Sequence, residues 1–456
     1  MELFGSSGIR GVVGEHLTPS VVLEVAQAAG TVLATDRVAV ARDTRLTGRM
    51  LTDAAASGLA SVGVDVDRLG QIPTPGLQAY AESEGVPGVM VTASHNPPEY
   101  NGIKLVGSDG VELPRERLEA VEEALLGEDG APTVAWDETG ATATIDSARE
   151  RYVEELLAAT DSETVAAADL TVALDPGHGA GALTSPEFFR ELGCRVKTVH
   201  AQPDGHFPGR NPEPVAETLG DLQRFVRATG ADLGVAHDGD ADRAIFVDER
   251  GELVPGSAAF AALAADELDA GDTLVSAVNV SQRLVDIVDD AGATLSMTPI
   301  GSTHIVTRIR RMEREGKRVP IAGEGNGGIL FPGFRIARDG AYTAARFCEV
   351  LAARDAPASR VVAPFDDYEN VRRNVSYDSD REREAMLEAL KRAATDADAE
   401  LDTTDGYRLD YGDGWVLARP SGTEPVVRVY AEARTRERAN ELADILSDPL
   451  ATTTAE

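Results

Sequence analysis

One polar stretch, residues 92–105, brings a hydroxyl, an imidazole and an ammonium close together in the chain, on Ser94, His95 and Lys104. The apolar residues 88–91 before it predict a buried strand, and the Asn-Pro and Asn-Gly pairs inside it are typical of turns. We therefore expect one loop that can carry a nucleophile, a proton carrier and a cation for phosphate. Taken alone, a Ser-His pair is more often part of a polar surface turn. The choice between a reactive loop and a surface turn therefore depends on the other polar loops.

Three aspartates, Asp238, Asp240 and Asp242, alternate along a second polar stretch and are followed by Arg243. Alternation in an extended loop places the carboxylates on one side, which suits a hard divalent cation. The same spacing begins a calcium-binding EF-hand, with Glu249 at its twelfth position. However, Arg243 stands at the sixth position, where that loop needs glycine, so this interpretation is weak. A phosphatase with an aspartate nucleophile also stays open for this stretch, as does a solvated acidic turn.

A glycine-rich stretch, residues 323–328, matches G-x-G-x-x-G and follows a predicted strand at residues 319–322. The residues that come next, 329–333, cannot open the long helix that a dinucleotide site requires. A glutamate held among glycines, Glu324, can instead accept hydrogen bonds from neighbouring sugar hydroxyls. Sugar binding and a flexible hairpin both stay open for this loop.

A cluster near the C-terminus combines guanidinium, hydroxyl and backbone donors around a glycine, which is the composition of a phosphate site. Its residues are Arg419, Ser421, Gly422, Thr423 and Arg428. Exposed arginines are common, but such a cluster is unusual in so acidic a chain. Phosphate binding is therefore favoured.

The chain of 456 residues carries 77 acidic and 43 basic residues, a formal charge of −34. This excess argues against nucleic acid or an anionic membrane as partner. Only four basic residues are lysines, and the acidic, lysine-poor composition indicates adaptation to high salt. No apolar run approaches the ~18 residues of a membrane span, and the first residues lack signal-peptide order, so we expect a cytoplasmic protein. Cys194 and Cys348 predict buried, reduced thiols.

Strand and helix patterns alternate along most of the chain, which predicts an α/β fold with parallel or mixed sheets covered by helices. We predict three α/β domains and one smaller C-terminal domain, at residues 1–148, 149–253, 254–360 and 361–456. Each polar loop follows a predicted strand, and ligands bind at the carboxyl ends of strands in such sheets. The four loops are therefore expected to face one cleft. The glycine-rich residues 5–11 predict a further loop, which carries Arg10.

Together these motifs resemble those of the α-D-phosphohexomutase superfamily, which includes phosphoglucomutase, phosphomannomutase and phosphoglucosamine mutase. The resemblance spans nearly the whole chain and rests on residues 8–11, 92–104, 238–243, 324–327 and 419–428. It implies three related α/β domains and a fourth, smaller α+β domain around a central cleft. The Gly-Glu-Gly-Asn-Gly-Gly form is similar to that of archaeal members.

The resemblance also implies a role for each matching residue. Ser94 would carry phosphate and, with Asp238, Asp240 and Asp242, would bind one Mg²⁺ per active site. Charge on the transferring phosphoryl group would be stabilised by Arg10 and Arg243, and proton transfer would be assisted by His95 and Lys104. Glu324 and Asn326 would bind the sugar, and the phosphate that is not transferred would be held by Arg419, Ser421, Gly422, Thr423 and Arg428.

By this resemblance the chain is an intramolecular phosphotransferase that interconverts hexose 6-phosphate and hexose 1-phosphate, with hexose 1,6-bisphosphate as intermediate and activator. Its partners would be small sugar phosphates, and it would be a monomer or homodimer. Phosphoglucosamine is the preferred substrate, with phosphomannomutase or phosphoglucomutase specificity as the alternative. Many relatives have serine where this chain has Asn326, and His304 is a candidate in a third-domain segment that varies. A non-enzymatic protein that binds a divalent cation and sugar phosphate is the more distant alternative.

Overall fold

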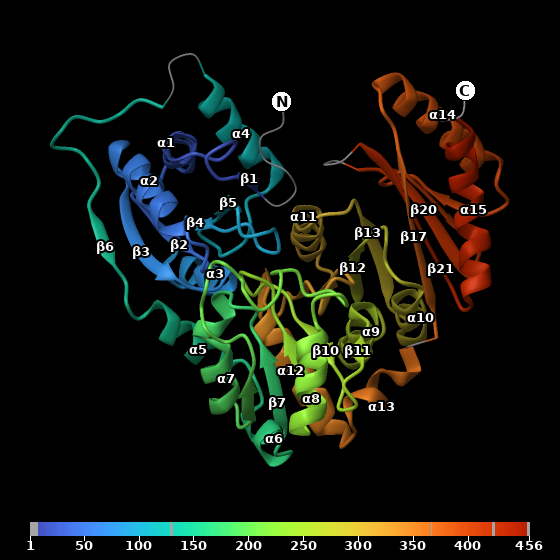
Figure 1. The fold of residues 1–456 in the computed structure, drawn as a ribbon. Coiled ribbons are helices and arrows are strands. Elements are labelled where there is room, and N and C mark those ends of the chain that lie inside the picture. The colour runs from blue at the N-terminus through green and yellow to red at the C-terminus, as the bar shows by residue number, and fades with distance from the viewer. Residues whose placement is uncertain (1–7, 128–130, 366, 422–424, 454–456) are drawn as a thin grey trace.

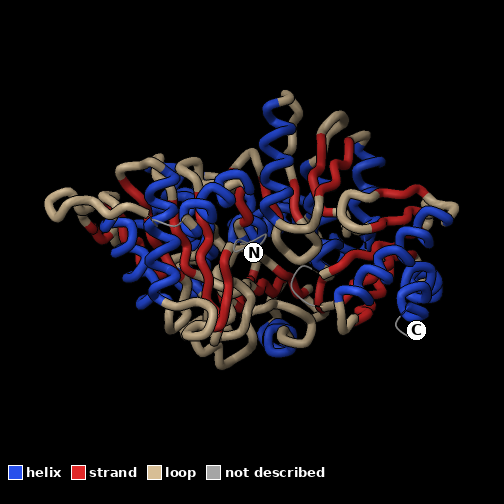
Figure 2. The backbone as a smooth tube through the Cα atoms, turned by 90° about the horizontal axis from the view of Figure 1, so that it is seen from above, coloured by secondary structure: helices blue, strands red, loops and turns tan. Residues whose placement is uncertain are grey.

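The computed structural model describes residues 8–127, 131–365, 367–421 and 425–453. Within these residues the chain forms four sheets, each built from one continuous part of the sequence and covered by helices (Figure 1). Seen from above, the molecule is elongated, with the C-terminus at one end (Figure 2). The four sheets confirm the predicted α/β fold, while the domain boundaries stay a prediction. Among the described residues, no helix is both long and apolar enough to span a bilayer.

The first unit is a six-stranded sheet in the order β1-β5-β4-β2-β3-β6. β2 pairs in parallel with β3 and β4, whereas β5 is antiparallel to both of its neighbours. Thr18 begins α1 by accepting a hydrogen bond from Val21 N (3.3 Å), and Gly85, with φ of 65°, ends α3. The elements are β1 (Ile9–Val12), α1 (Pro19–Leu33), β2 (Arg37–Arg42), α2 (Gly48–Ser61), β3 (Asp65–Gln71), α3 (Thr74–Glu84), β4 (Gly88–Val91), β5 (Tyr100–Val106), α4 (Arg115–Leu126) and β6 (Thr142–Thr144).

Two expectations about this unit are wrong. Residues 9–12 form β1 rather than a loop, and the Asn-Gly pair at 101–102 lies within β5 rather than in a turn, so Lys104 is a strand residue. A Cβ on Gly102 would lie 2.5 Å from the carbonyl oxygen of Ile9 and 2.7 Å from that of Thr92. This glycine therefore permits the close approach of neighbouring backbone segments and does not mark a turn.

The second unit is a five-stranded sheet in the order β11-β10-β9-β7-β8. β7 lies between β8 and β9 and is parallel to both, whereas β10 and β11 continue the sheet antiparallel. The elements are α5 (Ala148–Ala158), α6 (Ser162–Ala167), β7 (Thr171–Asp175), the 3₁₀ turn η1 (Ala180–Leu183), α7 (Ser185–Glu191), β8 (Arg195–Thr198), α8 (Gly220–Thr229), β9 (Leu233–Ala236), β10 (Ile245–Val247) and β11 (Leu253–Val254).

The third unit is a five-stranded sheet in the order β13-β12-β14-β15-β16. The strand expected at 319–322 is misplaced, because β14 comprises only two residues and begins at Ala322. Pro320 has no N–H for a sheet ladder, so this apolar run is buried without pairing along its length. The elements are α9 (Gly256–Glu267), β12 (Thr273–Ala277), α10 (Gln282–Ala291), β13 (Thr294–Thr298), α11 (Ser302–Arg314), β14 (Ala322–Gly323), β15 (Ile329–Phe331), β16 (Arg335–Arg338), α12 (Gly340–Arg354) and α13 (Ala358–Val362).

The second and third units share one apolar core. Phe246 of β10 stacks on Phe347 of α12 with ring centroids 4.5 Å apart, and the buried cluster around them continues into both sheets. Cys194 and Cys348 belong to this core as buried free thiols, as predicted. Separation of the two units would expose this apolar surface to water, which is unfavourable. The loop at residues 237–244 of the second unit and the loop at residues 324–328 of the third are therefore held beside each other.

The fourth unit is an antiparallel five-stranded sheet in the order β17-β21-β20-β19-β18. It joins the third unit through buried polar contacts: Glu432 accepts from the Ser281 hydroxyl (2.9 Å), and Arg408 donates to the Val278 carbonyl oxygen (2.6 Å). The elements are the 3₁₀ turn η2 (Ala363–Phe365), β17 (Glu369–Ser376), α14 (Asp380–Asp396), β18 (Glu400–Asp402), β19 (Tyr407–Asp410), β20 (Gly414–Pro420), β21 (Val426–Ala433) and α15 (Arg436–Thr453).

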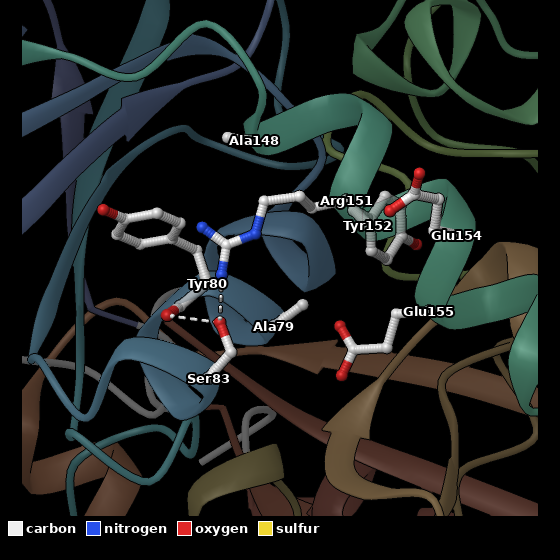
Figure 3. A pocket seen from close by; sticks show the side chains of 8 residues that line it. All are labelled: Ala79, Tyr80, Ser83, Ala148, Arg151, Tyr152, Glu154 and Glu155. Atoms are coloured by element: carbon white, nitrogen blue, oxygen red, sulfur yellow. Dashed lines mark hydrogen bonds between the residues drawn. The ribbon is translucent and has the colours of Figure 1, made fainter.

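A cavity of about 330 Å³ lies between α3 and α5 (Figure 3). Tyr152 in its wall donates to a carboxylate oxygen of Asp339 at 2.9 Å, and Asp339 caps α12 by accepting from Tyr342 N at 3.0 Å. Neither Ser94 nor the three aspartates line this cavity. The Tyr152–Asp339 hydrogen bond affects the site only indirectly, because it fixes the residue that immediately follows Arg338.

Candidate active site

Ser94 lies in the loop between β4 and β5 and is buried. Its backbone has a φ of 50°, in the left-handed region that residues other than glycine rarely adopt. The Ser94 amide donates to Thr92 Oγ1 (2.9 Å), and the Ser94 hydroxyl donates to Asp238 Oδ2 (2.7 Å). The loop therefore turns the serine away from its own sheet and toward the second unit.

The three aspartates occupy the short loop between β9 and β10, and all three are buried. One ligand oxygen from each lies within 4.8 Å of the others. The three Oδ1 atoms are buried and make no hydrogen bond to any described residue. Since a buried carboxylate oxygen without a partner is costly, the donor set fits a hard divalent cation that would complete it.

Cations and a hydroxyl occupy the opposite oxygens of the same carboxylates. Lys104 Nζ donates to Oδ2 of Asp240 (2.9 Å) and of Asp242 (3.2 Å). Thr74 Oγ1 donates to Asp240 Oδ2 (2.6 Å), and Arg338 Nη2 donates to Asp242 Oδ2 (2.6 Å). These contacts orient the carboxylates and leave their Oδ1 atoms without a hydrogen bond among the described residues.

The electrostatic environment differs among the three carboxylates. Burial and the neighbouring Asp242 and Asp240 raise the pKa of Asp238. Burial also opposes ionisation of Asp240 and Asp242, but Lys104 for Asp240 and Arg338 for Asp242 offset it, so both have a pKa below the usual value. Asp238, which receives the Ser94 hydroxyl, is thus the carboxylate whose charge is least compensated by the protein.

His95 and two arginines lie beside the serine. Arg243 Nη2 donates to His95 Nδ1 (3.1 Å), which is 3.3 Å from Ser94 Oγ. Burial, with the charges of Arg243 and Arg10, lowers the pKa of His95 to about 3, so the imidazole is neutral at neutral pH. Arg10, on β1, donates to Asn96 Oδ1 (2.9 Å) in the same loop. The structure thus brings together the residues of the first two units that the sequence singled out.

The glycine-rich loop is a hairpin between β14 and β15, with Glu324 half-buried and Asn326 exposed at its tip. A Cβ on Gly328 would lie 2.8 Å from Arg338 Cδ. The carbonyl of Gly327 also accepts from Ala244 N (3.1 Å), directly after the aspartate loop. The hairpin is thereby held beside the aspartate cluster.

Two interpretations of the sequence do not fit this geometry. The glycine-rich loop leads into β15 and not into a helix, so it lacks the helix N-terminus of a dinucleotide site. Glu249 lies beyond β10 and accepts hydrogen bonds from the backbone N–H (3.1 Å) and the hydroxyl of Ser359. It therefore cannot complete an EF-hand with the aspartates.

The fourth unit carries the described part of the predicted phosphate cluster. Arg419 on β20 is directly opposite Arg428 on β21. Arg419 Nε donates to Asp405 Oδ1 (3.0 Å), and Asp405 Oδ2 accepts from Ile300 N (3.0 Å) in the third unit, where His304 is exposed on the first turn of α11. The Ser421 backbone N–H donates to the Val426 carbonyl (2.8 Å), while Gly422 and Thr423 lie outside the described residues.

Sequence reasoning missed Arg338. Its guanidinium is buried, donates to Asp242, and lies 3.8 Å from a carboxylate oxygen of Glu112 in the first unit. A single arginine at the end of a strand belongs to no motif. The available signal was its position directly before Asp339, whose side chain begins α12.

We expect Arg338→Met to destabilise the protein by about 3 kcal/mol, because it removes the shorter of the two hydrogen bonds that cations of the described residues donate to the buried Asp242 and leaves only that of Lys104. The pKa of Asp242 should rise, since Arg338 is the positive charge that lowers it most. The matched control is Arg354→Met, which removes a half-exposed pair with Asp266 and should cost about 0–1 kcal/mol. Equal denaturant midpoints for the two variants at high salt would contradict this expectation.

Known protein families share this architecture. Models of the phosphoglucomutase/phosphomannomutase α/β/α domains I, II and III match residues 1–131, 150–251 and 256–368, and the model of the C-terminal domain matches residues 371–448. The chain belongs to the phosphoglucomutase/phosphomannomutase family. The resemblance drawn from the sequence motifs is thereby confirmed, and the family is one of mutase enzymes.

Relatives within this family match the chain along its whole length. A phosphoglucomutase/phosphomannomutase from Thermococcus kodakarensis is 40% identical and covers 97% of both chains. A probable phosphoglucosamine mutase from Methanopyrus kandleri is 41% identical, over 98% of this chain and 97% of the relative. Among solved structures, a family member from Burkholderia thailandensis superposes with a TM-score of 0.85 at 28% identity, over 99% of this chain and 98% of the other.

Proposed function

We propose that this chain interconverts hexose 6-phosphate and hexose 1-phosphate through a phosphorylated Ser94 and a hexose 1,6-bisphosphate intermediate. The observation that carries the proposal is the 2.7 Å hydrogen bond from Ser94 Oγ to Asp238, at the edge of a buried cluster of three carboxylates. A serine in an ordinary surface turn has no reason to be buried against a loop of another unit. Membership of a mutase family supports the same chemistry.

The aspartates would hold one Mg²⁺, because their three buried Oδ1 atoms accept no hydrogen bond from the described residues. When bound, the cation would neutralise charge on the phosphate of Ser94. A fungal N-acetylphosphoglucosamine mutase of the same fold, 16% identical with a TM-score of 0.62, was solved with magnesium. Lys104 keeps Asp240 and Asp242 ionised and oriented without blocking the Oδ1 side.

The residues around Ser94 would exchange protons and stabilise charge. In the first half of the cycle the P–O bond to Ser94 breaks, a P–O bond to a sugar hydroxyl forms, and Ser94 Oγ takes up a proton as the sugar oxygen loses one. In the second half Ser94 Oγ attacks the other phosphate, the P–O bond from that phosphate to the sugar breaks, and the serine proton passes to the sugar oxygen that leaves. Neutral His95, whose Nδ1 is 3.3 Å from Ser94 Oγ, would assist this proton transfer, while Arg10 and Arg243 would stabilise the transferring group.

Substrate would be held between the third and fourth units. Arg419 and Arg428 are directly opposite in the β20–β21 ladder, an arrangement of like charges that an anion would stabilise. Ser421 completes the described part of this phosphate site, with Gly422 and Thr423 beside it in the sequence. At the hairpin tip, Glu324 would accept hydrogen bonds from the sugar hydroxyls, and Asn326 could both donate to them and accept from them. A phosphate site that binds the phosphate at either end of the sugar would allow the bisphosphate to reorient, so that its other phosphate faces Ser94.

The preferred sugar is proposed to be glucosamine phosphate, with mannose and glucose phosphates as the alternatives. Relatives that match nearly the whole chain carry both kinds of name, phosphoglucosamine mutase and phosphoglucomutase/phosphomannomutase. An acidic group at the hairpin tip, Glu324, favours a sugar that carries an amino group. Asn326, 3.5 Å from Glu324 through its amide nitrogen, would orient that carboxylate.

The test is a mutase assay at molar salt with Mg²⁺, a trace of glucose 1,6-bisphosphate and, in separate reactions, glucosamine, mannose and glucose 6-phosphates. We expect each 1-phosphate to form without matching release of inorganic phosphate, fastest for glucosamine, as followed by ³¹P NMR. Release of phosphate alone would instead indicate an aspartate-nucleophile phosphatase. Binding without turnover would indicate a non-enzymatic binding protein.

A further inference from the structure

Arg45 is fully buried behind the serine loop, which comprises residues 92–99 between β4 and β5. The proposed mechanism does not use this arginine. Its guanidinium donates to three backbone carbonyl oxygens of that loop and one at the start of β5: Nη2 to Ser94 (2.9 Å) and Asn96 (2.6 Å), and Nη1 to Pro97 (2.6 Å) and Tyr100 (2.9 Å). The loop is therefore wrapped around one planar cation.

The fifth N–H of the guanidinium is also paired. Arg45 Nε donates to Asp43 Oδ2 (3.1 Å), which also accepts from the Thr92 hydroxyl (2.7 Å). Thr92 Oγ1 in turn accepts from the Ser94 amide (2.9 Å). Every donor of Arg45 is thus used, and Ser94 is held through both its N–H and its C=O.

The turn that carries Arg45 is also packed against the second unit. The guanidinium lies over the Phe207 ring, 5.2 Å from its centroid, and Thr44 Oγ1 donates to the His178 carbonyl (3.0 Å). A Cβ on Gly205 would lie 2.5 Å from Thr44 O, so the two segments touch through their backbones. Arg45 therefore connects the serine loop to the unit that carries the aspartates.

We propose that Arg45 is a positioning residue, which holds Ser94 in its left-handed conformation and sets the aim of its hydroxyl at Asp238. The inference rests on the proposed function of Ser94. Arg45 touches neither substrate nor metal, because its side chain has no exposed surface and the loop covers it. Holding a non-glycine residue at φ of 50° requires surroundings that determine the backbone, and four charge-assisted hydrogen bonds supply them.

The experiment compares Arg45→Lys with Arg49→Lys, a matched change at an exposed arginine nearby in the sequence. Lysine keeps the charge but has three donors instead of five, so at least two acceptors of the site lose their partner. We expect kcat to fall about 100-fold in Arg45→Lys with KM changed less than about threefold, because misplacing a reacting atom mainly affects the chemical step. Transfer of phosphate from glucose 1,6-bisphosphate to Ser94, followed by mass spectrometry, should slow equally. Arg49→Lys should match the wild type in both measurements.

Two further measurements separate positioning from folding and from the proposed function. Affinity for Mg²⁺ alone, measured by calorimetry, should stay within about twofold in Arg45→Lys, because the aspartates are untouched. Amide hydrogen exchange should accelerate in residues 92–101 of that variant and nowhere else in the first unit. Absence of transfer in the wild type would overturn the proposed function, whereas wild-type kcat or unchanged loop exchange in Arg45→Lys would overturn the role of Arg45.

A second variant covers the case in which Arg45→Lys does not fold. Asp43→Asn removes the acceptor at Oδ2 but leaves the four carbonyl contacts of Arg45 in place. We expect a smaller loss of kcat, about 10-fold, with KM again nearly unchanged. Wild-type kcat in a folded Asp43→Asn protein would overturn the proposal.

Discussion

Replacing Ser94 with alanine is expected to abolish interconversion of the hexose phosphates, with kcat at least about 10⁴-fold below that of the wild type. Ser94 Oγ is the atom that would bear the phosphate between turnovers. Among the described residues, no other hydroxyl donates to Asp238. Loss of the nucleophile cannot be compensated by tighter binding, so KM should change little.

The measurement is ³¹P NMR of the mutase reaction together with intact-protein mass spectrometry. Wild-type protein mixed with glucose 1,6-bisphosphate should gain one phosphate, and Ser94→Ala should gain none. Ser57→Ala is the matched control, because this exposed serine on α2 bonds only a carbonyl of its own helix. Undiminished turnover in Ser94→Ala, with Asp238 still required, would show that an aspartate is the nucleophile.

Asp238→Asn is expected to have effects of opposite sign on activity and on the stability of the metal-free protein. Activity and Mg²⁺ affinity should each fall on the order of 100-fold or more, because the uncharged amide is a poor ligand for a hard cation. Metal-free stability should be unchanged or higher, because the substitution removes one of three crowded carboxylates.

The pH dependence follows from the same crowding. Burial and the two neighbouring carboxylates raise the pKa of Asp238 in the folded protein above the ordinary 3.8. The stability that this raised pKa confers is present below pH 3.8 and is lost as the pH rises through the folded pKa. Thermal unfolding should be measured in EDTA, from below pH 3.8 to above the folded pKa of Asp238. The wild type should lose this stability as the pH rises, and Asp238→Asn should not. An Asp238→Asn protein that is less stable without metal and binds Mg²⁺ normally would contradict both expectations.

Local patterns in the sequence were sufficient for the position of two polar loops. Apolar runs of four residues ended at residues 91 and 236, and polar residues followed both, as β4 and β9 confirm, whereas the third run, at 319–322, enters a sheet only at Ala322. Alternation of the three aspartates indicated a common side, and their ligand oxygens do converge. These features depend on neighbours in the chain, which is why they can be read without the fold.

Local patterns were misleading where packing decided the backbone. The Asn-Gly pair at 101–102 has the composition of a turn, yet it lies in β5 because only glycine admits the carbonyls of Ile9 and Thr92 so closely. Residues 9–12 have the composition of a loop, yet β5 pairs with them over their full length. In both cases a distant strand supplied the hydrogen bonds that fixed the conformation.

By itself the sequence determined the α/β class, the order of the motifs and the residue types available for phosphoryl transfer, because these follow from periodicity and composition. Only the tertiary structure decided which atoms meet. Ser94 reaches Asp238 across 144 residues of chain, Arg338 pairs with Asp242 from another unit, and Arg45 uses all of its donors behind the serine loop. The first two contacts arise from the packing of different units against one another and the third from strand order within one sheet, and no local pattern encodes either.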